Sequence, residues 1–197
     1  AENEDAVYTV VKRTVNGSTV RMVERMHTRV FEEVEDCFFV DAGLSYDDPV
    51  YVSGATKATP VVITATAHGY SNGDLVDFAG FVAGEDSTGA ATNMTELNGN
   101  RYKVANKATN AFELTKPSDG TNINGTAFTT YKEGGYVRKA VTTLTGLDHL
   151  LGQTVKVLAD GNVISGKVVG SVTGGVGITL STAASRVHIG LGYVSDI

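Results

Sequence analysis

Short runs of β-branched and aromatic residues, separated by turns that contain glycine, recur along most of this chain. The clearest example is the first, where Asn16-Gly17 divides two such runs and supplies the positive φ angles that a two-residue hairpin turn needs. Similar turns stand at Asp160-Gly161 and Gly174-Gly175. Outside residues 28–35, no stretch of ten residues repeats apolar positions at the helical period. The pattern predicts an all-β fold with very little helix; residues 28–35 could form one or two helical turns or an extended segment. The run Phe38-Phe39-Val40 is expected to be buried and to end in a turn at Asp41-Ala42-Gly43.

The middle of the chain contains further strand-like runs with turn residues between them. Short strands at such spacing are typical of a small barrel or sandwich. Two polar stretches, 82–93 and 117–125, lack apolar periodicity, and we expect them to be mobile loops. The predicted strands of the middle and end are 61–65, 75–78, 101–104, 111–114, 136–138, 167–173, 176–180 and 186–191, with a hairpin around 160–161.

The composition changes near Pro49 and again near Lys139, and the segment between is rich in Thr, Asn, Gly and Ala. This change predicts a β-domain made of residues 1–48 and 140–197, with a β-barrel-like module of residues 49–139 inserted into it. The chain starts at Ala1 without a methionine, and we expect it to be an excised piece of a longer protein.

The net charge of −6 is concentrated in the first quarter of the chain. Residues 1–48 carry 11 acidic and 5 basic residues, whereas 49–139 carry 8 of each and 140–197 carry 3 of each. Binding of nucleic acid needs clustered Lys and Arg, so this balance predicts no tight DNA binding. A cluster of Lys57, Lys103 and Lys107 in space would contradict that prediction.

Three blocks of the middle segment share an order with a known module: Ala67-His68-Gly69-Tyr70-Ser71-Asn72-Gly73-Asp74-Leu75-Val76-Asp77-Phe78, residues 94–104 and Asn110-Ala111-Phe112-Glu113-Leu114. They resemble the first catalytic cysteine half-domain of ubiquitin-activating enzymes, a small β module that also recurs in phage tail proteins. Between Phe81 and Met94 this chain carries an additional loop that such modules lack. The module does not itself hold that family's reactive cysteine, and the chain has no glycine-rich nucleotide loop, so adenylation is not implied.

Five blocks of the flanking segments share an order with a known family: residues 8–17, 23–26, 39–46, 147–153 and 187–191. They resemble the tail nozzle (tail tubular protein B) of short-tailed bacteriophages. In that family Leu44-Ser45-Tyr46 leads almost directly into the segment at 143–149, so the 90 or so residues between them here indicate an insertion. The resemblance implies a ring of subunits, six in the full-length protein, through which DNA leaves the virion.

Motifs for catalysis or metal binding are missing from the sequence. The four histidines, His27, His68, His149 and His188, are too far apart in sequence to form a local metal pair. A turn or cap is the expected role of His68, a structural hydrogen bond is that of His149, and His188 is expected to face the lumen or the surface. The lone Cys37 cannot form an internal disulfide and is expected to be a buried, inert thiol. The acidic groups at 32–36, 47–48 and 85–86 lack the spacing of a calcium loop. We therefore predict no enzyme activity, no catalytic residues, no cofactor and no metal.

Two functions remain open. The first is a non-enzymatic structural component of a phage tail, located in the virion. Its partners would be other copies of itself in a ring, neighbouring tail or adaptor proteins, and a host-surface glycan as a further possibility, with no membrane. The second is a carbohydrate-binding or carbohydrate-degrading module of a tail or cell-surface protein. Such modules stack sugars on aromatic rings; the chain has no Trp, and the rings available are Tyr51, Tyr70, Tyr102, Tyr131 and Tyr136.

Overall fold

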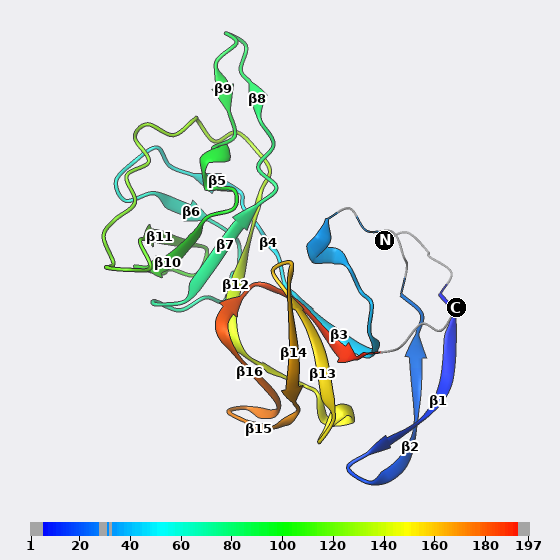
Figure 1. Cartoon of the computed structure of the whole chain (residues 1–197). Helices are drawn as coiled ribbons and strands as arrows, with labels where there is room; N and C mark the ends of the chain where they lie inside the picture. Colours follow the sequence, from blue (N-terminus) through cyan, green and yellow to red (C-terminus); the bar gives the residue numbers. More distant parts are fainter. Residues whose placement is uncertain (1–5, 28–30, 32, 193–197) are drawn as a thin grey trace. The chain divides into compact units, whose positions relative to one another are not determined.

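The computed structural model describes residues 6–27, 31 and 33–192, and they form an all-β protein (Figure 1). Strands paired in antiparallel fashion make up the sheets. The helical content of the described residues is limited to three short 3-10 turns. These are η1 (Val34–Asp36), η2 (Thr95–Leu97) and η3 (Asp148–Leu150). The predicted all-β class is therefore correct.

The chain divides into two compact units. The split unit consists of Ala1–Tyr46 and Thr142–Ile197, and the inserted unit is Asp47–Val141. The composition change had suggested borders after residues 48 and 139, each two residues from the structural border. Since the inserted segment is a compact unit of its own, it can be described without reference to the rest of the chain.

The inserted unit is built on one antiparallel sheet in the order β12-β7-β10-β11-β6-β5. The segment 50–55 joins the two ends of this sheet, because β4 pairs with β12 while β5 pairs with β6. The sheet therefore closes on itself, which is the barrel-like arrangement predicted for this module. The strands are β4 (Val50–Tyr51), β5 (Gly54–Ala55), β6 (Val62–Thr64), β7 (Leu75–Ala79), β10 (Arg101–Ala105), β11 (Ala111–Thr115) and the first part of β12 (Tyr136–Thr145), whose residues from Thr142 on belong to the split unit.

The core of the inserted unit follows from strict alternation along its strands. In β7 and β10 every second residue is buried, which is the period of a strand with one face on a core. Side chains with essentially no exposed surface meet there, among them Phe78, Phe112 and Leu114. The whole hydrophobic cluster lies between Val52 and Val137. The inserted unit thus has a hydrophobic core made only of its own residues.

The stretch 82–93, predicted to be a mobile loop, is instead a short hairpin. Its strands are β8 (Gly84–Glu85) and β9 (Ala91–Thr92), and Figure 1 shows it projecting from the barrel of its own unit. Asn93 ties its base: the side-chain amide donates to the Val82 carbonyl at 2.9 Å, and its oxygen accepts from the Lys132 and Glu133 amides. The prediction of an unstructured loop missed this side-chain anchor.

The split unit contains a four-stranded antiparallel sheet in the order β14-β13-β17-β3, the hairpin β15–β16, whose β16 strand pairs with β12, and the separate hairpin β1–β2. Asn16 and Gly17 have φ of 46° and 77°, as the two-residue turn of the first hairpin requires. The strands are β1 (Tyr8–Val15), β2 (Ser18–Arg25), β3 (Asp41–Asp47), β13 (Thr154–Ala159), β14 (Asn162–Val168), β15 (Gly170–Val172), β16 (Gly175–Ala184) and β17 (Arg186–Leu191).

Two local expectations in the split unit are wrong. Residues 41–43 were expected to form a turn, but β3 begins at Asp41, and Gly43 packs so close to the Phe38 ring and the Ile189 carbonyl that no side chain would fit. Phe39 was expected to be buried and is 58% exposed. For residues 28–35, the structure shows η1 from Val34; residues 28–30 and 32 lie outside the described part.

Candidate functional site

His68 is a structural residue of the inserted unit. Its Nε2 donates to the Ala108 carbonyl at 3.0 Å and its Nδ1 accepts from the Tyr70 amide at 3.0 Å, a pattern that requires the neutral ring. The ring is 5% exposed and packs against Tyr70 and Phe112. Because both ring nitrogens are used by the backbone, His68 could act as a base or a metal ligand only by losing a structural bond.

Two histidines of the split unit also make structural hydrogen bonds. His149 on η3 bonds through Nε2 to the Ala42 carbonyl at 2.8 Å. His188 on β17 is buried, and its Nδ1 lies 2.6 Å from the exposed Ser45 hydroxyl on β3. A Ser–His pair resembles half of a catalytic triad, but a triad also needs donors for an oxyanion and an acid that orients the ring. Here the pair fastens two neighbouring strands of one sheet.

His27 stacks its ring on Phe38 with 4.6 Å between the ring centroids, and Phe38 meets the His188 ring edge-on. The Phe38 ring, on the segment that leads into β3, therefore lies between the His27 ring and the His188 ring of β17.

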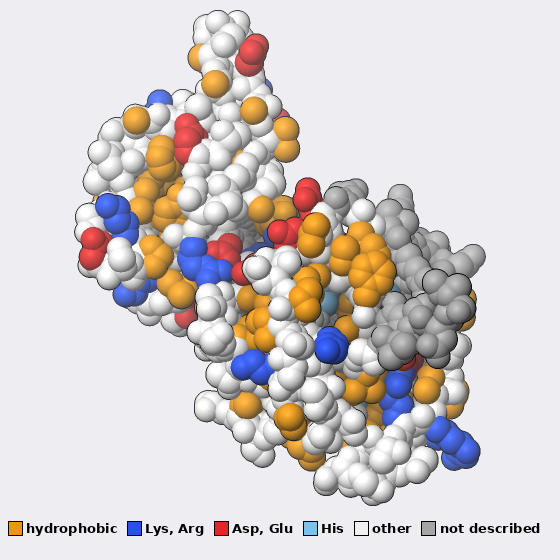
Figure 2. All heavy atoms as spheres, viewed as in Figure 1, with side chains coloured by type: hydrophobic (Ala, Val, Ile, Leu, Met, Phe, Trp, Pro, Cys, Tyr) orange, Lys and Arg blue, Asp and Glu red, His pale blue; other side chains and the backbone are white. Residues whose placement is uncertain are grey.

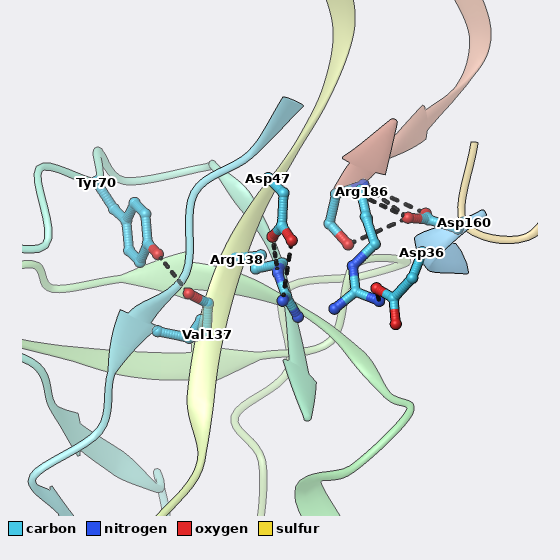
Figure 3. Close-up of polar contacts among 8 residues, drawn as sticks. Asp36, Asp47, Tyr70, Val137, Arg138, Asp160 and Arg186 are labelled. Carbon is cyan, nitrogen blue, oxygen red and sulfur yellow. Dashed lines mark hydrogen bonds and ion pairs between the residues drawn. The ribbon is translucent and has the colours of Figure 1, made fainter. Parts of the chain in front are cut away.

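Most carboxylates that were candidates for calcium binding take part in ion pairs or caps. Asp36 pairs with Arg186, whose backbone amide is held by Asp160, and Asp47 pairs with the nearly buried Arg138 (Figure 3). Burial would lower the pKa of Arg138, but the hydrogen bond and charge of Asp47 raise it above the usual value, so it stays charged. These carboxylates compensate buried or half-buried guanidinium groups, which is a structural role.

In the projecting hairpin, Asp86 accepts hydrogen bonds from the Thr88 amide, the Thr88 hydroxyl and the Ala90 amide. The Thr88 hydroxyl and these amides hold the pKa of Asp86 below its ordinary value. Asp86 therefore shapes the hairpin tip as a charged turn residue.

Within residues 6–27, 31 and 33–192, no group of three or more His, Cys, Asp or Glu could hold a metal ion. Cys37 was expected to be buried; it is half-buried at the end of η1, and its sulfur lies 3.9 Å from the Glu33 carbonyl.

The tyrosines do not form an exposed platform for sugar rings. Tyr70 and Tyr102 are buried, and the Tyr70 hydroxyl donates to the Val137 carbonyl at 3.0 Å (Figure 3). Tyr131 donates to the Val52 carbonyl at 2.8 Å, and Arg138 lies over the Tyr136 ring at 4.1 Å. Among the five tyrosines considered for sugar stacking, Tyr51 is well exposed, at 75%. This arrangement favours a structural role for the rings over stacking against a carbohydrate.

An open depression of about 310 Å³ lies beside His68 in the inserted unit. It is lined by the 67–71 turn together with Lys107, Ala108 and Thr109, and most of its lining is polar. Ligand pockets are usually concave, apolar and more enclosed. The depression therefore offers little to hold a small molecule.

The β1–β2 hairpin has a surface that the charge count of the sequence did not reveal. Its outer face is formed by the cross-strand pairs Tyr8–Arg25, Val10–Val23, Lys12–Arg21 and Thr14–Thr19, and contains three cations and no acid. The acidic Glu24 lies on the other face, where it forms a two-point ion pair with Arg13. Figure 2 shows blue side chains over this hairpin at the lower right. A basic face thus exists within the most acidic quarter of the chain, and strand alternation was the signal that could have found it.

In the part of the chain that the structure describes, no helix has the length and apolar character to cross a membrane. No protein-family model matches the sequence, and no curated protein matches it significantly.

Proposed function

We propose that this chain is part of a non-enzymatic structural protein of a bacteriophage tail, of the nozzle type, whose subunits form a ring around the path of DNA ejection. One observation carries the proposal. The segments that resemble a tail nozzle, among them 8–17, 39–46 and 187–191, all belong to the split unit, and the segments that resemble the half-domain module all belong to the inserted unit. The segments of one resemblance flank those of the other in the sequence, and the two sets fall into different compact units of the fold.

The chemistry of the candidate residues also supports a structural role. The His68, His149 and His188 rings bond to the backbone or to a neighbouring strand, and the acidic residues Asp36 and Asp47 bond to guanidinium groups. A catalytic site needs groups that are free to bind substrate and exchange protons. The groups here stabilise the fold instead.

Under this proposal the inserted unit serves for contact with other proteins or with the host surface. Its hairpin β8–β9 projects from the barrel and carries the exposed Val82 near its base. Loops and hairpins that extend from a rigid scaffold commonly bind partners. Neighbouring tail or adaptor proteins are the first candidates, and a host-surface glycan is the second.

The mass of the full-length parent protein tests the proposal directly. Light scattering coupled to size-exclusion chromatography should give the mass of a closed ring, with six subunits expected. A full-length parent protein that stays monomeric in this measurement would refute the ring.

A second experiment tests the absence of enzyme activity. The chain should release no product from tail-relevant polysaccharides or peptidoglycan, with or without EDTA. Turnover that is abolished by changing one carboxylate would overturn the structural assignment.

A further inference from the structure

The outer face of the β1–β2 hairpin is suited to a protein partner. Val10 and Val23 lie directly opposite each other and are 70% and 72% exposed, and Tyr8 beside them is 62% exposed. The next pair is Lys12 opposite Arg21, both exposed. Like charges directly across two strands destabilise a hairpin, and exposed apolar pairs gain little from each other in water. Both costs are relieved if an acidic and apolar surface covers this face.

The split unit carries a surface of that kind around η1. Val34 is 63% exposed and Phe39 is 58% exposed, and both lie in the seven residues from Glu33 to Phe39, which also contain the acidic Glu35. Asp36, by contrast, is paired with Arg186 and folds η1 onto β17. The acidic turn, defined here as Glu33, Val34, Glu35 and Phe39, therefore presents an exposed carboxylate, a half-buried carboxylate and two large apolar side chains.

We propose that the hairpin face of one copy (Tyr8, Val10, Lys12, Arg21 and Val23) docks onto the acidic turn of a second copy, head to tail. Charge complementarity selects this occupant, since two cations flanked by apolar side chains meet two carboxylates flanked by apolar side chains. Because the two surfaces differ, the contact is heterologous, and repetition of such a contact generates a ring when the rotation closes. The inference rests on the proposed ring function and names the surfaces that build it.

The alternative occupant of the hairpin face is nucleic acid, because β-ribbons with cations can contact phosphates. Lys12, Arg21 and Arg25 are few cations for binding DNA. The acidic turn of a second copy offers both carboxylates and apolar side chains to the hairpin face, whereas phosphates offer charge alone. The observations therefore favour a second copy over DNA.

A charge-swap experiment on the 197-residue chain tests the contact. Sedimentation velocity from about 10 μM to about 1 mM covers the affinities expected of one partial interface. The wild type should be largely monomeric at the low end and associate at the high end. The double variant Lys12→Glu/Arg21→Glu should weaken association at least about tenfold, and so should Glu33→Lys/Glu35→Lys. An equimolar mixture of the two variants should recover association, because each supplies the surface that complements the other.

The matched control is Lys107→Glu/Lys116→Glu, the same change of charge at exposed lysines of the inserted unit; it should associate as the wild type does. Circular dichroism should show all variants folded. No association of the wild type at the highest concentration, or no recovery in the mixture, would overturn the docking proposal. Saturable duplex DNA binding that is lost in Lys12→Glu/Arg21→Glu would also overturn it and assign the face to nucleic acid. A ring in the full-length parent together with a failed swap would leave the proposed function standing and remove only this contact.

Discussion

Substitution of Gly177 by Ala tests the close approach of β16 to β12. A Cβ at this position would lie 1.8 Å from the Leu144 carbonyl oxygen and 2.8 Å from its carbonyl carbon. Both are backbone atoms, so no side chain can rotate away to make room. Since real Cβ atoms essentially never come closer than 3.0 Å, the two strands must separate by at least 1.2 Å, which is 3.0 minus 1.8.

The magnitude follows from what such a separation breaks. The Leu147 amide bonds to the Val176 carbonyl at 3.1 Å, and a further 1.2 Å would stretch this bond beyond useful range. Loss of one or two strand bonds costs about 1 kcal/mol each, and distortion of a packed core costs about 1–3 kcal/mol. Leu144 and Ile178, which are 3% and 2% exposed, would lose part of their packing. We expect Gly177→Ala to lower the free energy of unfolding of the split unit by roughly 2–5 kcal/mol.

Gly170→Ala in the neighbouring β15 is the matched control. No atom lies within 4 Å of a Cβ built at Gly170, and its φ is not in the left-handed region. The added methyl reduces the freedom of the unfolded chain, so the change should be neutral or stabilising by about 0.4–1 kcal/mol. Urea titration followed by NMR signals of β13 and β17 reports on the split unit separately. Equal stability of the two variants would refute the reasoning from close strand approach.

Three further predictions concern the inserted unit. Residues 47–141 expressed alone should unfold cooperatively and keep β-sheet circular dichroism, because their core and sheet closure are internal; a chain without cooperative unfolding would contradict this. Asn93→Ala should speed limited proteolysis within the β8–β9 hairpin without changing the melting temperature of the barrel by more than a few degrees, whereas unchanged cleavage would mean that Asn93 does not anchor it. Burial alone would raise the pKa of Glu96, but backbone amides and the Thr129 hydroxyl hold that pKa below its ordinary value. The ionised carboxylate therefore stabilises the fold at pH values above the unfolded pKa, and this stabilisation is lost as the pH falls through the folded pKa. Glu96→Gln should flatten the fall of the urea midpoint below about pH 4.5, and an unaltered fall would refute this.

Elements with strong local signals were predictable from the sequence. Asn16-Gly17 and Asp160-Gly161 adopt positive φ angles between paired strands, as their residue types require. Alternation of apolar residues located β7, β10 and β11 to within one residue at each end. In these segments local propensity and burial favour the same structure, so sequence alone is sufficient.

Elements whose stability comes from distant residues were not predictable. The two-residue strands β4 and β5 are too short to show a pattern, and they form because 50–55 pairs with both ends of one sheet. The sequence predicts a turn at Gly43, but its missing side chain instead allows β3 to approach the Ile189 carbonyl of β17. The partners of β4 and of Gly43, which are Tyr136–Val137 and Ile189, are distant in the sequence, and no local pattern encodes them.

The distribution of charge shows the same limit and bears on function. Residues 1–48 carry a net −6, and this count argued against a basic surface. Strand pairing sorts the charges: Glu24 turns inward to pair with Arg13, and Lys12 and Arg21 face outward together. Residues 26–48, which follow the hairpin, carry seven acidic residues and one basic residue, and three more acidic residues precede the hairpin. A chain with separate basic and acidic surfaces of this kind is suited to heterologous contacts between identical subunits, since each copy offers both complementary halves.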